Sequence, residues 1–319
     1  MTSVARWAEV HRLAMAGREA GIARDVGGRV GRVWLATSRF ADVARLAGLT
    51  LTLGADARAF YQLGWAKDAT GDPTAALAAY GQALPLYRAD GDRGREAGTL
   101  SNIGVAYRGL GELQRALNYF GQALPIQREV GDRAGEAITL NNIGGVYRGL
   151  GELQRALEYY GQALPIQREV RDRVGEATTL NNIGAAYRVL GELQRALEYY
   201  RQALPIRRES GDRAGEATTL NNIGAAYYDL GERQRALEYF GQVLLIRREV
   251  GDRAGEAVTR YNVAMIHRAQ GDLDRAVAEL EQVVELDRQV GRPDLASDTE
   301  MLVRVRQELA TSGPGHGPR

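Results

Sequence analysis

Residues 177–216 read ATTLNNIGAAYRVLGELQRALEYYRQALPIRRESGDRAGE, and residues 217–256 repeat them almost letter for letter as ATTLNNIGAAYYDLGERQRALEYFGQVLLIRREVGDRAGE. Similar stretches precede this pair at the same spacing of about 40 residues. Six glycines mark the period: Gly71, Gly111, Gly151, Gly191, Gly231 and Gly271. A fixed period of this length predicts a solenoid of stacked units, so function is to be sought on a long surface and not in a catalytic pocket.

Each copy of the repeat reads as a pair of amphipathic helices. Across residues 180–190, apolar side chains recur at three- and four-residue steps, which is typical of a helix that buries one face. Gly191 ends this helix, and a second apolar stripe runs through residues 193–206. Asp212 stands where its carboxylate can cap the next first helix. The sequence therefore predicts an all-α fold in which every copy is a helical hairpin.

Small and aromatic side chains recur in each expected hairpin in a pattern that resembles the tetratricopeptide repeat family. The family pattern is a small residue, a tyrosine three positions later, a glycine at the turn, and then alanine, an aromatic residue and alanine on the second helix. Two copies carry it at Gly104, Tyr107, Gly111, Ala116, Phe120 and Ala123, and at Gly144, Tyr147, Gly151, Ala156, Tyr160 and Ala163. The resemblance covers residues 57–296, six copies, and implies a right-handed superhelical solenoid of antiparallel hairpins. The long period, with its LNN and GDRAGEA signatures, is similar to the repeats of kinesin light chains, of LGN-type spindle-orientation adaptors and of bacterial STAND-type signalling proteins.

Outside the six copies, both ends of the chain are expected to close the solenoid. We expect residues 1–56 to form an N-terminal helical cap with a degenerate repeat, in which residues 33–48 form a second helix with Trp7 and Trp34 in its packing. We expect residues 297–310 to form a C-terminal capping helix with a polar outer face. Residues 311–319, rich in Gly and Pro, predict a disordered tail.

The composition argues against several classes of function. With 41 basic and 40 acidic residues, the chain has no bulk attraction for nucleic acid or for an anionic membrane. Cysteine is absent and the three histidines, His11, His267 and His316, are scattered, so no metal cluster is expected. Lys67 is the only lysine, which excludes a Walker-type phosphate loop. Because no Ser-His-Asp arrangement is visible either, we expect no enzyme activity and no cofactor.

The distribution of apolar residues bears on location. No stretch approaches the ~18 uninterrupted apolar residues of a membrane span. Charged residues interrupt the apolar runs near the N-terminus before the core of a signal peptide could form. We therefore expect a cytoplasmic protein, and the use of arginine in place of nearly all lysine indicates a GC-rich bacterial genome.

The candidate functional surface is the face of each first helix that turns away from its partner helix. At ~100° per residue, Asn182, Ala185 and Val189 project opposite to the buried stripe. The resemblance implies that this face lines a concave groove, with one asparagine per copy on its floor: Asn102, Asn142, Asn182, Asn222 and Asn262. Further polar residues are expected at the groove edge: Asn141, Asn181, Asn221, Arg108, Arg148, Arg188 and Arg268. Trp65 and Tyr228, in outer copies, could anchor apolar side chains.

A row of carboxamides suits an extended peptide, because each amide offers donors and an acceptor to a peptide backbone. Arginines beside the row favour carboxylates, so the expected partner is an extended peptide that is acidic or polar. Two other interpretations stay open. The asparagines could serve packing between neighbouring helices or be copied with the repeat without binding anything, and the arginines could be solvated charges.

We expect a non-enzymatic scaffold that binds an extended segment of a partner protein in the groove. The alternative is a sensor, either for a short signalling peptide or as the sensory part of a STAND-type switch. Near-identical copies with incomplete caps could also stack end to end, which would be a structural role. The sequence does not identify the partner, the oligomeric state, or whether the chain belongs to a larger signalling protein.

Overall fold

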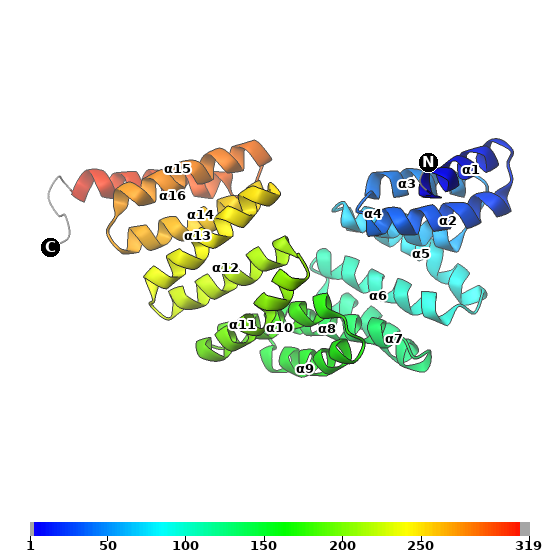
Figure 1. The fold of residues 1–319 in the computed structure, drawn as a ribbon, viewed down its shortest axis with the longest axis horizontal. Coiled ribbons are helices and arrows are strands. Elements are labelled where there is room, and N and C mark those ends of the chain that lie inside the picture. Colours follow the sequence, from blue (N-terminus) through cyan, green and yellow to red (C-terminus); the bar gives the residue numbers. More distant parts are fainter. Residues whose placement is uncertain (1–2, 313–319) are drawn as a thin grey trace. The chain divides into compact units, whose positions relative to one another are not determined.

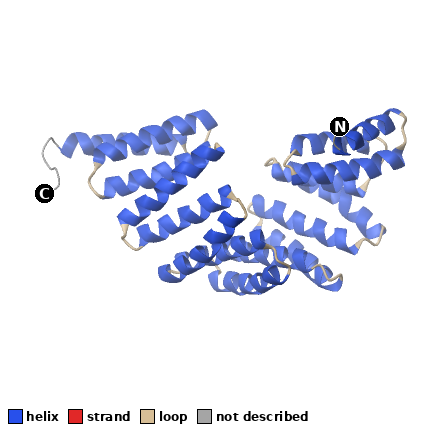
Figure 2. Ribbon diagram, viewed as in Figure 1, coloured by secondary structure: helices blue, strands red, loops and turns tan. Residues whose placement is uncertain are grey.

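The computed structural model describes residues 3–312, and all regular structure in that range is α-helical (Figures 1 and 2). The predicted all-α fold is therefore confirmed. The helices in chain order are α1 (Ser3–Ala16), α2 (Ala20–Ala36), α3 (Phe40–Leu51), α4 (Ala57–Ala69), α5 (Pro73–Ala89), α6 (Arg93–Gly109), α7 (Leu113–Glu129), α8 (Arg133–Gly149), α9 (Leu153–Glu169), α10 (Arg173–Val189), α11 (Leu193–Glu209), α12 (Arg213–Asp229), α13 (Arg233–Val250), α14 (Arg253–Ala269), α15 (Leu273–Val290) and α16 (Leu295–Ser312).

The helices divide between two compact units, which are described separately. The N-terminal unit, Met1–Val170, contains α1 to α9, and the C-terminal unit, Arg171–Arg319, contains α10 to α16. In the N-terminal unit α4 packs on α5, α6 on α7 and α8 on α9; in the C-terminal unit α10 packs on α11, α12 on α13 and α14 on α15. Each pair is a hairpin closed by a short turn, and consecutive hairpins of a unit lie against one another (Figure 1).

Aspartates begin the first helices of all six hairpins; besides Asp56 at α4, five of them recur at the repeat spacing. The side chain of each accepts a hydrogen bond from the backbone N–H three residues later, which satisfies one of the unpaired donors at a helix start. These caps are Asp92, Asp132, Asp172, Asp212 and Asp252. At Asp212 the bond from the N–H of Gly215 is 2.8 Å long, which confirms the predicted cap.

Arg171 occupies a turn position at which other copies carry glycine. Its φ of 57° lies in the left-handed region, where the equivalent residues Gly131 and Gly211 have φ values of 70° and 68°. A side chain in this region costs roughly 1–2 kcal/mol, because Cβ approaches the following carbonyl oxygen.

We predict that Arg171→Gly stabilises the protein by up to about 1 kcal/mol. Relief of the left-handed conformation outweighs the extra chain entropy that glycine loses on folding. Urea unfolding followed by circular dichroism measures the change. The reverse exchange in the next such turn, Gly211→Arg, should lower stability by a similar amount, and an unchanged midpoint for Arg171→Gly would contradict the prediction.

The two helices of a hairpin approach most closely where a glycine faces an aromatic ring. A Cβ built on Gly184 would lie 2.6 Å from Cε1 of Tyr200, whose side chain is fully buried. The same contact recurs between Gly64 and Tyr80, Gly104 and Phe120, Gly144 and Tyr160, and Gly224 and Phe240.

We predict that Gly184→Ala destabilises the protein by about 1–3 kcal/mol, because the added methyl overpacks the ring contact. The matched control is Gly121→Ala in α7, where a new Cβ meets nothing within 4 Å. Since alanine is the better helix former, this control should gain about 0.5–1 kcal/mol. Chemical denaturation compares the two, and stabilisation by both variants would show that the ring contact does not set the helix spacing.

A buried glutamate lies near the start of each first helix from α6 to α14, and in α8 it ties this start to the end of the helix before it. Glu136, 4% exposed, accepts hydrogen bonds from Arg128 at 2.8 Å and from Arg133. Burial alone would raise the pKa of Glu136, but these two arginines hold it below the ordinary value. Arg133 also bonds to Glu169 at the end of α9, so the contact links the two helices of the hairpin.

The N-terminal cap differs from its predicted form. The prediction of one helix over residues 33–48 is wrong, because the chain turns between α2 and α3. Ser38 takes a left-handed φ of 56°, and the hydroxyl of Thr37 donates to a carbonyl of α2 at 3.0 Å. The apolar spacing continues across this turn because α3 packs back on the same core, with Val43 fully buried. Trp34 does lie in that packing, as predicted.

The C-terminal helix α16 extends beyond the predicted cap of residues 297–310 at both ends. Thr311 and Ser312, expected in a tail, are helical instead. Their hydroxyls donate to carbonyls one turn earlier, at 3.0 Å and 2.7 Å, which compensates for their weak helix propensity. The remaining residues of the predicted tail, 313–319, lie outside the described range.

A pair of carboxyl groups is buried where α16 meets α15. Asp287 is fully buried and Asp298 is 8% exposed, while Arg292 donates to Asp287 at 2.8 Å. Burial, together with the hydrogen bond and charge of Asp287, raises the pKa of Asp298 to about 6. The charge of Asp294 acts in the same direction and that of Arg292 against it.

We predict that this pair makes the C-terminal unit more stable in mild acid. A raised pKa means that the contribution is complete below the ordinary aspartate value of 3.8 and is lost as pH rises through about 6. Asp298→Asn keeps a neutral hydrogen-bonding side chain, so the wild type should lose thermal stability relative to this variant between about pH 4 and about pH 6.5. The exposed Asp274→Asn near the start of α15 serves as the control, and parallel melting profiles of the wild type and Asp298→Asn would contradict the prediction.

Within residues 3–312, no helix has both the length and the apolar character needed to cross a membrane. The same residues contain no group of histidine, aspartate and glutamate side chains placed to hold a metal ion.

Candidate functional site

The predicted site residues lie on the free face of the first helices. On α10, Ile183 and Gly184 are buried, Asn182 and Ala185 are half-buried, and Val189 is 62% exposed. This burial confirms the predicted division between a packed and a free face. We call the free faces of α4, α6 and α8 the first-helix surface of the N-terminal unit, and those of α10, α12 and α14 the first-helix surface of the C-terminal unit.

In the N-terminal unit, predicted asparagines are hydrogen-bonded between neighbouring first helices. Nδ2 of Asn102 donates to the hydroxyl of Tyr61 at 3.0 Å, which joins α6 to α4. Oδ1 of Asn142, 9% exposed, accepts from Arg108 at 3.1 Å and joins α8 to α6. Burial lowers the pKa of Arg108. Asn141 is half-buried on α8.

The C-terminal unit uses its asparagines in the same way. Nδ2 of Asn222 donates to Oδ1 of Asn181 at 3.0 Å, which joins α12 to α10. Asn182 and Asn262 are half-buried on the same surface. These bonds support the packing interpretation for Asn102, Asn142 and Asn222, since each ties one first helix to the next.

Two of the four predicted arginines already hold carboxylates. Arg188 pairs with Asp229 at 2.7 Å, and Arg268 donates twice to Glu308 of α16. Arg148 is exposed on α8. A ligand carboxylate at Arg188 or Arg268 would therefore have to displace a carboxylate of the chain itself.

Several predicted residues come together around one cavity of about 380 Å³ in the C-terminal unit. We call it the polar cavity. Its lining residues are Arg188, Asn221, Asn222, Ala225, Tyr228, Asp229, Phe240, Asn262 and Met265. Oδ1 of Asn221 is buried there without a hydrogen-bond partner in the described part of the chain, and Tyr228 is 41% exposed.

The N-terminal unit contains a larger cavity of about 480 Å³, between α2, α4 and α6. We call it the arginine–aromatic cavity. Its lining residues are Arg32, Leu35, Ala36, Arg58, Tyr61, Gln62, Trp65, Tyr87, Gly94, Arg95 and Gly98. The predicted residue Trp65 forms one wall and is 44% exposed.

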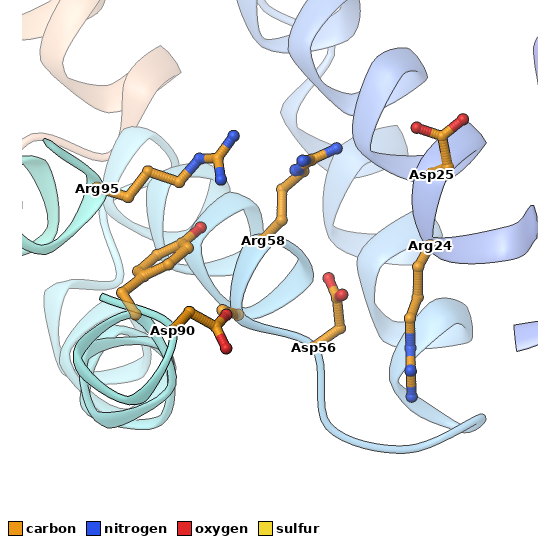
Figure 3. A pocket seen from close by; sticks show the side chains of 8 residues that line it. Arg24, Asp25, Asp56, Arg58, Asp90 and Arg95 are labelled. Carbon is orange, nitrogen blue, oxygen red and sulfur yellow. The ribbon is translucent and has the colours of Figure 1, made fainter. Parts of the chain in front are cut away.

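A smaller cavity of about 230 Å³ adjoins this one and shares Arg58, Tyr87 and Arg95 with it. Figure 3 shows Arg95 of α6 and Arg58 of α4 next to one another, with Asp90 and Asp56 below them and Arg24 and Asp25 of α2 on the far side. Asp56 is committed to the fold, since it caps α4 by accepting from the N–H of Ala59 at 2.7 Å.

Sequence reasoning missed Arg32, Arg58 and Gln62 as lining residues of the arginine–aromatic cavity. The repeat spacing could have indicated two of them. Gln62 of α4 stands at the position of Asn102 in α6, and Arg58 stands at the position of Gly98. Nε2 of Gln62 donates to a carbonyl of α2 at 3.0 Å, so it ties neighbouring helices as the asparagines do. No signal pointed to Arg32, because α2 lies outside the six copies.

Models of the tetratricopeptide repeat match most of the repeated region. One model matches residues 95–169, 162–209, 175–248 and 215–289, and a second matches residues 57–90; both are described as Tetratricopeptide repeat. No curated protein matches the chain.

Solved structures with a similar fold include three that bear on the predicted resemblance. A Signal Transduction ATPase with Numerous Domains (STAND) protein with a tetratricopeptide repeat sensor, from Pyrococcus horikoshii, is 17% identical with a TM-score of 0.72; the match covers 90% of this chain and 44% of that one. A Rap protein complexed with Competence and Sporulation Factor is 16% identical with a TM-score of 0.63, covering 97% and 99%. The repeats of a putative kinesin light chain from Podosopora anserina are 19% identical with a TM-score of 0.50, covering 61% and 96%. The resemblance to kinesin light chain and STAND arrays is thus confirmed at the level of the fold.

Proposed function

Because the chain belongs to the tetratricopeptide repeat family, we propose that it is a non-enzymatic scaffold that binds an extended segment of a partner protein along its first-helix surface. The polar cavity carries this proposal, since it gathers Arg188, Asn221, Asn222, Tyr228 and Asn262 from three successive first helices. The buried Oδ1 of Asn221 has no partner within residues 3–312. A peptide N–H would satisfy this acceptor, which is otherwise costly to leave unpaired.

The walls of the polar cavity suit a side chain as well as a backbone. Tyr228 and Met265 offer apolar surface, and Ala225 between them leaves room for a ligand. Aromatic residues dominate binding energies at protein interfaces, and methionine adapts to irregular shapes. The volume of about 380 Å³ lies in the usual range of ligand sites. The near balance of basic and acidic residues supports a protein partner over nucleic acid or a membrane surface.

The proposal is tested by selecting peptides from a random phage-displayed library on the full chain and measuring their affinities. Replacing Asn221, Asn222 and Asn262 together by Ala should weaken the selected peptides at least about tenfold, because their backbone bonds are lost. The control is Asn118→Ala on the exposed side of α7, outside the first-helix surface. Circular dichroism verifies folding. Equal affinity for the wild type and the triple variant would refute binding at the polar cavity.

We further propose that acidic peptides are preferred, with Arg188 as their contact. Asp229 already pairs with this arginine and would compete with a ligand carboxylate. At the equivalent position the three preceding copies have Gly109, Gly149 and Val189. We predict that Asp229→Asn raises the affinity for acidic peptides by about two- to fivefold, since a partly exposed pair is worth up to about 1 kcal/mol. Isothermal titration calorimetry at low and high salt measures the affinities. An increase of the same size for neutral peptides would contradict the assignment.

A second candidate function is that of a sensor, either for a signalling peptide or within a larger STAND-type switch. The likeness in fold to the Rap protein and to the STAND sensor supports it. Small-angle scattering with and without a selected peptide separates the two functions, because a sensor changes its dimensions on binding and a scaffold does not. Sedimentation at rising concentration tests the further possibility of end-to-end self-association.

A further inference from the structure

The arginine–aromatic cavity exists because α6 departs from the four later copies at two positions. Gly98 stands where Ile138, Thr178, Thr218 and Val258 stand in the first helices of those copies, and Gly94 stands where they have alanine or valine. A Cβ built on Gly98 would have only the Tyr61 hydroxyl near it, at 3.9 Å. An isoleucine would therefore fit at Gly98 without a clash at Cβ and would fill the space that now forms the cavity.

The charges that line this cavity have one sign. Arg32, Arg58 and Arg95 are the ionisable groups with full charge among its lining residues, and no carboxylate is among them. Arg95 pairs with Asp92 at 2.6 Å. Within residues 3–312, Arg32 and Arg58 have no hydrogen bond or ion pair to a carboxylate, unlike Arg188 and Arg268. Two guanidinium groups are thus available for an anion.

The apolar wall is held in place before any ligand arrives. The rings of Tyr61 and Trp65 meet edge to face with centroids 6.2 Å apart, and the hydroxyl of Tyr61 is fixed by Asn102. Gln62, between them on α4, is anchored to α2. Leu35 and Ala36 of α2 complete the wall. Preorganised aromatic surface binds with little loss of side-chain entropy.

We propose that the arginine–aromatic cavity binds an acidic side chain that stands next to an aromatic or aliphatic one in the partner's extended segment. The carboxylate meets Arg32 and Arg58, and the apolar neighbour lies against Trp65. This proposal rests on the proposed function and adds to it a second subsite, in the N-terminal unit, with its own chemistry. The volume of about 480 Å³ suffices for the two side chains.

The test uses the full chain and a defined set of probes. These are fluorescein-labelled, amidated decapeptides that carry Asp-Leu, Asp-Phe or Asp-Trp in a Gly-Ser background, with matched peptides in which Asn replaces Asp or Ser replaces the apolar residue. Fluorescence anisotropy gives affinities at low and high salt. The Asp-containing apolar peptides should bind the wild type at least about tenfold more tightly than either matched set, with affinity falling as salt rises.

Two variants address the cavity itself. Gly98→Ile fills the cavity, and its control is Gly121→Ile on the open face of α7. Arg32→Ala combined with Arg58→Ala removes the two arginines that have no carboxylate partner, and its control is the exposed Arg45→Ala. Each cavity variant should lose at least about tenfold in affinity while its control stays within twofold. Binding that survives both cavity variants within twofold would overturn the proposal.

The outcomes also separate this proposal from the proposed function. If the probes depend on Asn221, Asn222 and Asn262 and not on the cavity variants, the scaffold function stands and the second subsite is refuted. If neither these probes nor any peptide of the phage library binds the wild type, both are refuted.

Discussion

Contact between a glycine backbone and a buried aromatic ring sets the distance between the two helices of a hairpin. Because Gly184 lacks a Cβ, the ring of Tyr200 lies where that atom would be, and the ring is wholly buried there. The second helix can then reach the apolar side chains of the first and exclude water from between them. The aspartate caps and the arginine-held glutamates define where each first helix starts. The distance between the paired helices and the residue at which the first helix starts together fix the rotation of the first helix about its axis. One face of this helix is therefore turned away from its partner helix.

That free face is where the copies differ, and the differences create the cavities. Tyr228, Asp229 and Met265 distinguish the polar cavity, while Trp65 and Gly98 distinguish the arginine–aromatic cavity. The asparagine row is less free than its repetition implies, since Asn102, Asn142 and Asn222 bond to neighbouring first helices. Because the hairpin is repeated while its free face varies from copy to copy, one fold can carry subsites of different chemistry. Repeat proteins bind their partners on this physical basis.

Most of the fold follows from local rules that the repeat displays many times. Helix period, turn glycines and capping aspartates each need only a few neighbouring residues, so hairpins were predictable between residues 57 and 296. The N-terminal break at Ser38 was not, because apolar spacing runs through it and a left-handed serine has no clear sequence signal. The helical Thr311 and Ser312 were missed because their hydroxyl bonds to the preceding turn offset a composition typical of a tail.

The sequence by itself determined the family, the hairpin and the face of each first helix that stays free, because these depend on periodicity and on contacts within one copy. Only the tertiary structure decided which side chains on that face are available. Arg188 and Arg268 find carboxylates 41 and 40 residues away, whereas Arg32 and Arg58 find none among the described residues. Such pairings depend on how neighbouring helices pack within a unit, and a hydrogen bond forms only within a few tenths of an ångström of its preferred length. Repeat spacing predicts the position of a side chain along its helix, and packing decides what it meets there.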